Sequence, residues 1–122
     1  MEMSVNILEM LVYMIAAHFL LDYALQGDWM SKAKNATLDL VTGERIWPLA
    51  LFGHALLHAT AVQIITGSWF LFTLELVIHW LTDFGKCKGR FGYNTDQYIH
   101  IACKLAYAVV LINPAVAASS AL

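Results

Sequence analysis

Charged residues are scarce in this chain of 122 residues. They make up 13% of the sequence, whereas hydrophobic residues make up 60%. Ordinary soluble domains carry about 25% charged residues. A soluble domain of this size cannot bury so much apolar surface, so the composition excludes that class and favours an integral membrane protein. The length predicts a single domain, 1–122.

Thiols and positive charge are also in short supply. The two cysteines, Cys87 and Cys103, form no C-x-x-C pair, which argues against a structural zinc site of the finger type. The net charge is −2 with neutral histidine, and no basic patch is interleaved with aromatic residues. Nucleic acid is therefore not an expected partner. The N-terminal segment lacks the basic region of a signal peptide, because Glu2 and Glu9 stand there.

Long apolar stretches predict four membrane-spanning helices. Each is long enough to enter a bilayer at a rise of about 1.5 Å per residue. Pro48 suits the first turn of the second helix, where its missing N–H does no harm. Gly67 and Ser68 predict a tight reversal before the third. The expected fold class is an all-α four-helix transmembrane bundle with helices at about 5–26, 48–66, 69–85 and 95–113.

The basic residues predict how these helices are oriented. Six of the seven lysine and arginine residues lie in the connections 27–47 and 86–94, which four spans place on the same side. By the positive-inside rule, these connections are cytoplasmic and both termini face out. The sequence thus predicts a multi-pass protein of the bacterial inner membrane that contacts membrane lipids. The six residues are Lys32, Lys34, Arg45, Lys86, Lys88 and Arg90.

All five histidines fall at a similar predicted depth, within the cytoplasmic leaflet, when residues are counted from the cytoplasmic helix ends. Histidine and aspartate also recur one helical turn apart, so that both side chains share a face. Imidazole and carboxylate in this proportion suit Zn²⁺, with Mn²⁺ or Fe²⁺ as alternatives. The candidate metal ligands are His18, Asp22, His54, His58, His79, Asp83 and His100.

Seven candidates exceed the three or four ligands that one catalytic zinc needs. Either two ions are bound a few Å apart, or some candidates orient the ligands instead of binding. A metal-free alternative is a salt-bridge or proton-relay network that pairs Asp22 or Asp83 with Lys104. The candidate catalytic groups are Glu75 and Asp83. The candidates for orienting ligands are Gln26, Asp96, Gln97 and Lys104.

The basic segment after the third predicted helix has two interpretations. In the first interpretation, the topology is set and anionic lipids are contacted by Lys86, Lys88 and Arg90. In the second they contact a substrate phosphate, helped by Gly89 and Gly92, whose backbone N–H groups an anion can approach closely.

The ordered polar residues resemble those of a family of small bacterial and phage membrane proteins catalogued as a domain of unknown function. The residues that carry this resemblance are His18, Asp22, Gln26, His54, His58, Glu75, His79, Asp83, Lys86, Asp96, Gln97 and His100. The resemblance covers nearly the whole chain and implies a fold and a motif. More distantly, the histidine and aspartate pattern is similar to membrane-bound metal-dependent hydrolases, although the chain has no Pro-Asp-x-Asp segment. It also has no His-His dipeptide of the kind found in di-iron desaturases.

Two functions follow as hypotheses. The first is a membrane-embedded metal-dependent hydrolase, holding one or two ions, that acts on a lipid or lipid-linked phosphate or ester at the cytoplasmic leaflet. The second is a non-enzymatic membrane protein that carries a metal or proton or acts through partners. Small residues along the predicted helices also permit homo-oligomers.

Overall fold

A computed structural model describes residues 2–113, with side chains from residue 6 onward. Over this range the chain is all-α, as predicted, with five α-helices, one π-helical turn and no strand. The elements are α1 (Glu2–Phe19), η1 (Leu20–Ala24), α2 (Gly27–Ala33), α3 (Trp47–Thr66), α4 (Trp69–Cys87) and α5 (Tyr93–Ile112). Both ends of the predicted domain, residue 1 and residues 114–122, lie outside the described residues.

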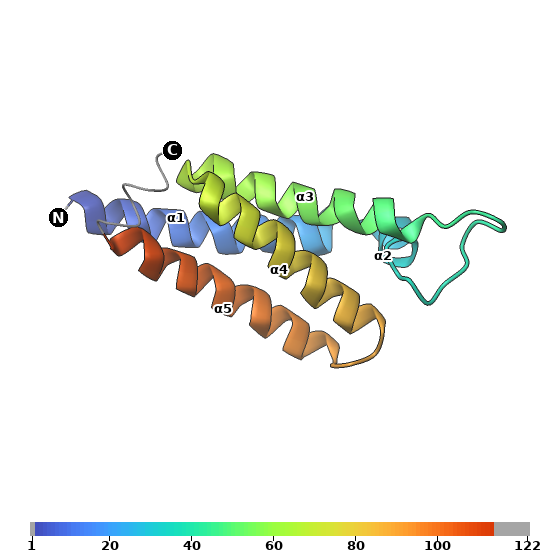
Figure 1. Ribbon diagram of the computed structural model, residues 1–122. Helices are drawn as coiled ribbons and strands as arrows, with labels where there is room; N and C mark the ends of the chain where they lie inside the picture. The colour runs from blue at the N-terminus through green and yellow to red at the C-terminus, as the bar shows by residue number, and fades with distance from the viewer. Residues whose placement is uncertain (1, 114–122) are drawn as a thin grey trace.

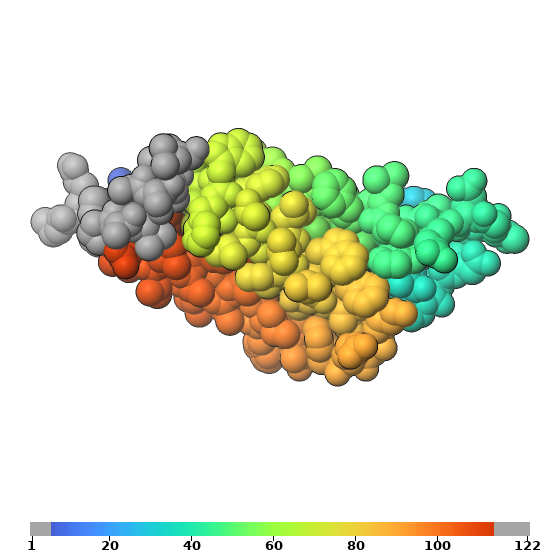
Figure 2. Space-filling model, viewed as in Figure 1, coloured from blue at the N-terminus to red at the C-terminus, as the bar shows by residue number. Residues whose placement is uncertain are grey.

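The four long helices lie alongside one another and alternate in direction (Figure 1). Helix α3 packs against α4 and α1, and α5 packs against α1 and α4. Helix α2 and the connection that follows it lie at the same end of the molecule as the α4–α5 connection (Figure 1). The space-filling view shows side chains of α3, α4 and α5 filling the spaces between the ribbons (Figure 2).

Two helices in the described part of the chain are long and apolar enough to cross a membrane. They are the segments Asn6–Ala24 and Trp47–Thr66. Helix α4 carries Glu75, Asp83 and Lys86 within its length, which interrupts its apolar sequence. Composition therefore supports two of the four predicted spans.

The first predicted helix, 5–26, is not continuous. Helix α1 ends at Phe19, and the next turn is π-helical, with the Leu25 N–H donating to the Leu20 carbonyl at 2.9 Å. Gly27 then has φ +70°, a left-handed conformation that glycine adopts without steric cost, and α2 begins there. The predicted connection 27–47 therefore contains a short helix that returns the chain towards the other helices.

The reversal between α3 and α4 uses the two residues predicted for it. Gly67 ends α3 with φ +72°, and its N–H donates to the Gln63 carbonyl at 2.7 Å. Ser68 caps α4, because its Oγ accepts a hydrogen bond from the Leu71 N–H at 3.0 Å.

We expect Gly67→Ala to lower the free energy of unfolding by about 1 kcal/mol, because alanine is strained at positive φ. Gly53→Ala is the matched control. Gly53 lies inside α3, and a Cβ there meets no atom within 4 Å, so alanine should stabilise the helix by about 0.5–1 kcal/mol. Unfolding in mild detergent measures both variants. Equal changes in the free energy of unfolding of the two variants would contradict this account of the turn.

Polar side chains, not apolar ones, dominate the interior. A small apolar core, formed by Met14, Val62, Leu71 and Tyr107, lies among the four long helices. Large hydrophobic side chains are exposed along the outer faces of all four, for example Val12, Leu57, Val77 and Val109. The buried polar and charged side chains are His18, Lys34, His54, His58, Ser68, Glu75, His79, Thr82, Asp83, Asp96, Gln97, His100 and Lys104.

Candidate metal centre

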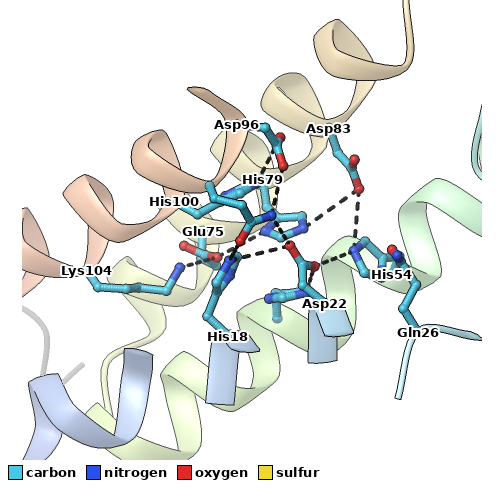
Figure 3. Close-up of polar contacts among 12 residues, drawn as sticks. His18, Asp22, Gln26, His54, Glu75, His79, Asp83, Asp96, His100 and Lys104 are labelled. Atoms are coloured by element: carbon cyan, nitrogen blue, oxygen red, sulfur yellow. Dashed lines mark hydrogen bonds and ion pairs between the residues drawn. The ribbon is translucent and has the colours of Figure 1, made fainter. Parts of the chain in front are cut away.

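The five histidines come together from four helices: His18 from α1, His54 and His58 from α3, His79 from α4 and His100 from α5. Figure 3 shows His18, His54, His79 and His100 directed towards one another. All are buried. His79 is at the centre, with its ring centroid 3.8 Å from that of His58 and 4.2 Å from that of His100, both stacked. The histidines, which were predicted to lie at a similar depth, are therefore in direct contact with one another. We call these histidines and the carboxylates around them the cluster.

Asp22 projects into the cluster from the π-helical turn η1. Its Oδ1 lies 2.8 Å from His58 Nε2 and 3.1 Å from His54 Nε2. Its Oδ2 accepts a hydrogen bond from Gln97 Nε2 at 3.0 Å and lies 3.4 Å from His18 Nε2. The Asp22 side chain is 8% exposed. Single π-helical turns occur often at functional sites, and this one directs a carboxylate at histidines from α1 and α3.

Gln97 connects α5 to this carboxylate. Its Nε2 also donates to Asp96 Oδ2 at 3.1 Å, and its Oε1 accepts from His18 Nε2 at 2.8 Å. Asp96 is buried, with Oδ1 3.3 Å from His100 Nε2. Gln97 thus has the predicted orienting geometry, and Asp96 faces the cluster and is itself a possible ligand.

Glu75 lies on the side of His79 away from Asp22. Its Oε1 accepts from Lys104 Nζ at 2.7 Å and lies 3.3 Å from His79 Nδ1, and its Oε2 accepts from the Tyr107 hydroxyl at 2.8 Å. The contact with Nδ1 favours the tautomer in which His79 Nε2 keeps its lone pair and faces the cluster. These engaged oxygens favour an orienting role for Glu75 over the predicted catalytic one.

Asp83 lies at the edge of the cluster, where its Oδ2 accepts from Lys34 Nζ at 2.6 Å. The nearest imidazole nitrogens are farther away, His54 Nε2 at 3.4 Å and His79 Nε2 at 3.9 Å. Lys34 also donates to Gln26 Oε1. Lys34 belongs to a connection predicted to be cytoplasmic, but the lysine is buried and neutralises the carboxylate predicted as both ligand and catalytic group.

Several buried ligand atoms face the cluster without a hydrogen-bond partner. Among the described residues these are His18 Nδ1, His58 Nε2, His79 Nε2, Asp96 Oδ1 and His100 Nε2. His58 Nε2 lies 2.8 Å from Asp22 Oδ1 but forms no hydrogen bond with it. Each such atom costs about 1–3 kcal/mol when it stays unpaired. The geometry fits a shared cation better than mutual hydrogen bonds.

Three sets of side chains bring one ligand atom each to within 4.8 Å of one another. They are Asp22 with His54, His58 and His79; His18 with His79 and His100; and Asp22 with Asp96 and His100. Asp83 and Glu75 belong to none of these sets. Nitrogen and carboxylate donors in such sets are those that zinc, manganese and iron bind in proteins.

Residues 10–122 match the family described as "Protein of unknown function (DUF3307)". The chain belongs to this family. No curated protein and no solved structure matches this chain. The resemblance to an uncharacterised family is confirmed, and the cluster is the feature that this DUF3307 chain offers for a functional argument.

The electrostatics of the cluster leave negative charge uncompensated. Lys34 neutralises Asp83, and Lys104 neutralises Glu75. Within residues 6–113, neither Asp22 nor Asp96 has an ion pair with lysine or arginine. With neutral histidines the cluster therefore has a formal charge of −2. Buried charge of this size is costly unless a cation balances it.

The predicted anion contacts lie apart from the cluster in this DUF3307 chain. Lys86 Nζ lies over the Tyr93 ring at 5.4 Å, Lys88 Nζ lies over the Phe84 ring at 5.5 Å, and Arg90 is exposed. A cavity of about 430 Å³ is formed by residues 36–39 and 43–47, and no cluster residue lines it. A function is therefore sought among the buried side chains.

Proposed function

We propose that this DUF3307 chain is a membrane-embedded, metal-dependent hydrolase acting on a lipid or lipid-linked phosphate or ester. One observation carries the proposal. Asp22, His54, His58 and His79 bring four ligand atoms together in a buried site, and two of the imidazole nitrogens have no hydrogen-bond partner. A divalent cation satisfies these atoms and balances the formal charge.

The cation supplies the chemistry, because it lowers the pKa of a water towards ~7 and polarises the scissile group. The protein holds and orients the ligands. Glu75 fixes the His79 ring, and Gln97 holds Asp22 through Oδ2. His18, kept in place by Gln97, is positioned to accept or donate a proton at Nδ1.

The inverted distribution of polarity supports the membrane setting. Charged groups are buried between the helices, while aliphatic side chains such as Leu57, Val77 and Val109 face outward. In water this arrangement exposes apolar surface at a cost, whereas in a bilayer the same surface faces hydrocarbon, and ionisable groups are tolerated there only when they face the interior of the bundle. The lysine- and arginine-bearing connections lie at one end of the helices, which favours the cytoplasmic leaflet for the site (Figure 1).

A second function, proton or metal transfer without hydrolysis, has its own supporting observation. The stacked rings of His58, His79 and His100 form a row from α3 through α4 to α5. A series of neighbouring imidazoles in the interior of a membrane protein is typical of proton relays.

The test compares His58→Ala/His79→Ala with wild type and with Gln63→Ala, a control in the same helix as His58 but outside the cluster. Metal content and hydrolysis of a lipid phosphate and a lipid ester in vesicles are measured. Loss of orienting residues alone costs about 10–100-fold in metal affinity, so the double variant should lose at least ~100-fold in both readouts. Metal-free, folded wild-type protein would exclude the hydrolase. Bound metal with proton flux and no turnover would favour transfer.

A further inference from the structure

The two oxygens of Asp22 face different sets of ligands. Oδ1 lies beside His54 and His58, at 3.1 and 2.8 Å. Oδ2 lies on the side of Gln97, whose amide also contacts Asp96. A carboxylate whose oxygens point to two ligand groups has the geometry of a bridge between two cations.

The ligand sets on the two sides of Asp22 differ in number. The first set, which we call site A, adds His54, His58 and His79 to the aspartate and offers four ligand atoms. The second, site B, adds Asp96 and His100 and offers three. Four protein ligands are typical of a zinc site that holds its ion closed, and three of a site that keeps a position for water or substrate.

Gln97 marks where positive charge is favoured between the two aspartates. Its Nε2 donates to Asp22 Oδ2 at 3.0 Å and to Asp96 Oδ2 at 3.1 Å. An amide provides only partial positive charge between two carboxylates that have no lysine partner. The buried Asp96 Oδ1 and His100 Nε2, which lack hydrogen bonds, face each other at 3.3 Å. This arrangement provides a second set of atoms suited to a cation, which shares only Asp22 with site A.

We infer that the cluster holds two divalent cations bridged by Asp22, with site A closed and site B open to the substrate. The inference rests on the proposed function and deepens it, because it names a substrate class. One divalent ion neutralises the formal charge of −2, whereas two leave +2. A site with that charge, and with two ions about 3.5–4 Å apart, suits the dianionic phosphate of a lipid phosphate monoester.

The test counts ions in the full-length protein in mild detergent, loaded with Zn²⁺ or Mn²⁺. Wild type should bind two per chain. His54→Ala/His58→Ala, which removes site A ligands, and Asp96→Asn/His100→Ala, which removes site B ligands, should each retain one. Asp22→Asn should weaken the binding of the second ion by more than the ~10–100-fold typical of orienting residues. Asp39→Asn, in the exposed connection, is the control and should retain two.

Electron paramagnetic resonance of the Mn²⁺-loaded wild type provides a readout that needs no variant to fold. Two bridged ions should give an exchange-coupled spectrum. One ion per chain at saturation, or two ions with the spectrum of isolated Mn²⁺, would overturn the inference. These results are independent of turnover. Two coupled ions with hydrolysis of the ester alone would overturn the substrate class but leave the bridged pair. Two coupled ions with hydrolysis of neither substrate would also overturn the proposed function. One ion per chain together with phosphate hydrolysis would overturn the bridged pair but leave the substrate class and the proposed function.

Discussion

Glu75→Gln should lower the free energy of unfolding by about 3–5 kcal/mol, because it leaves the Lys104 ammonium group buried without a counter-charge. Both side chains are buried, and Lys104 Nζ is 2.7 Å from Glu75 Oε1. The loss is comparable with much of the total stability of a small domain. Unfolding in mixed detergent micelles, followed by circular dichroism, measures it.

A double-mutant cycle separates the charge effect from a packing effect. Lys104→Met alone leaves a buried carboxylate and should cost a similar amount, whereas Glu75→Gln/Lys104→Met removes both charges and should recover much of the stability. Glu9→Gln is the matched control, because Glu9 is exposed on α1, and it should change stability by no more than about 0.5 kcal/mol. Additive losses in the double variant would show that the pair is not coupled.

The gathering of histidines was predictable because it depends on regular features of the chain. Helical rise fixes depth along each helix, and spacings of four residues place partners such as His54 and His58 on one face. Once alternating helix directions are assumed, these two rules bring all five rings close together, and the ring contacts in the structure agree with this. No prediction of individual side-chain contacts is needed for that result.

The partners of the acidic residues were not predictable in the same way. Asp22 or Asp83 is the predicted partner of Lys104 in the metal-free alternative, but Lys104 binds Glu75 and Asp83 binds Lys34. Such choices depend on which way each helix is rotated about its axis. A difference of one position moves a side chain by about 100° around a helix of 3.6 residues per turn.

Lys34 was missed because the break after Ala24 was missed. A continuous helix to residue 26 carries the following residues away from the other helices, whereas the π-helical turn and the positive φ of Gly27 redirect α2. The charges of the predicted helices indicated that a further cation was required. The predicted helices held more carboxylates than the single lysine among them, so a cation from a connection was needed.

Lys34→Met should destabilise the protein by about 3–5 kcal/mol, because Asp83 then stays buried without the ammonium group 2.6 Å away. The chain offers a matched control two residues earlier. Lys32 pairs with Asp28 at 2.8 Å, but both side chains are exposed, so Lys32→Met should cost no more than ~1 kcal/mol. Unfolding in detergent without added metal compares the two. Similar losses in both would show that Lys34 does not act through a buried ion pair.

Added Zn²⁺ then relates this ion pair to the metal centre. In the wild-type structure the Asp83 carboxylate lies 3.4 Å from His54 Nε2 and 3.9 Å from His79 Nε2, and both histidines belong to site A. Lys34→Met frees this carboxylate from its ion pair. The extra negative charge should tighten binding there, and a ligand that binds only the folded state raises stability with its affinity. Zn²⁺ should therefore raise the melting temperature more in Lys34→Met than in wild type. An equal increase would mean that Lys34 serves stability alone and does not keep Asp83 from the ion.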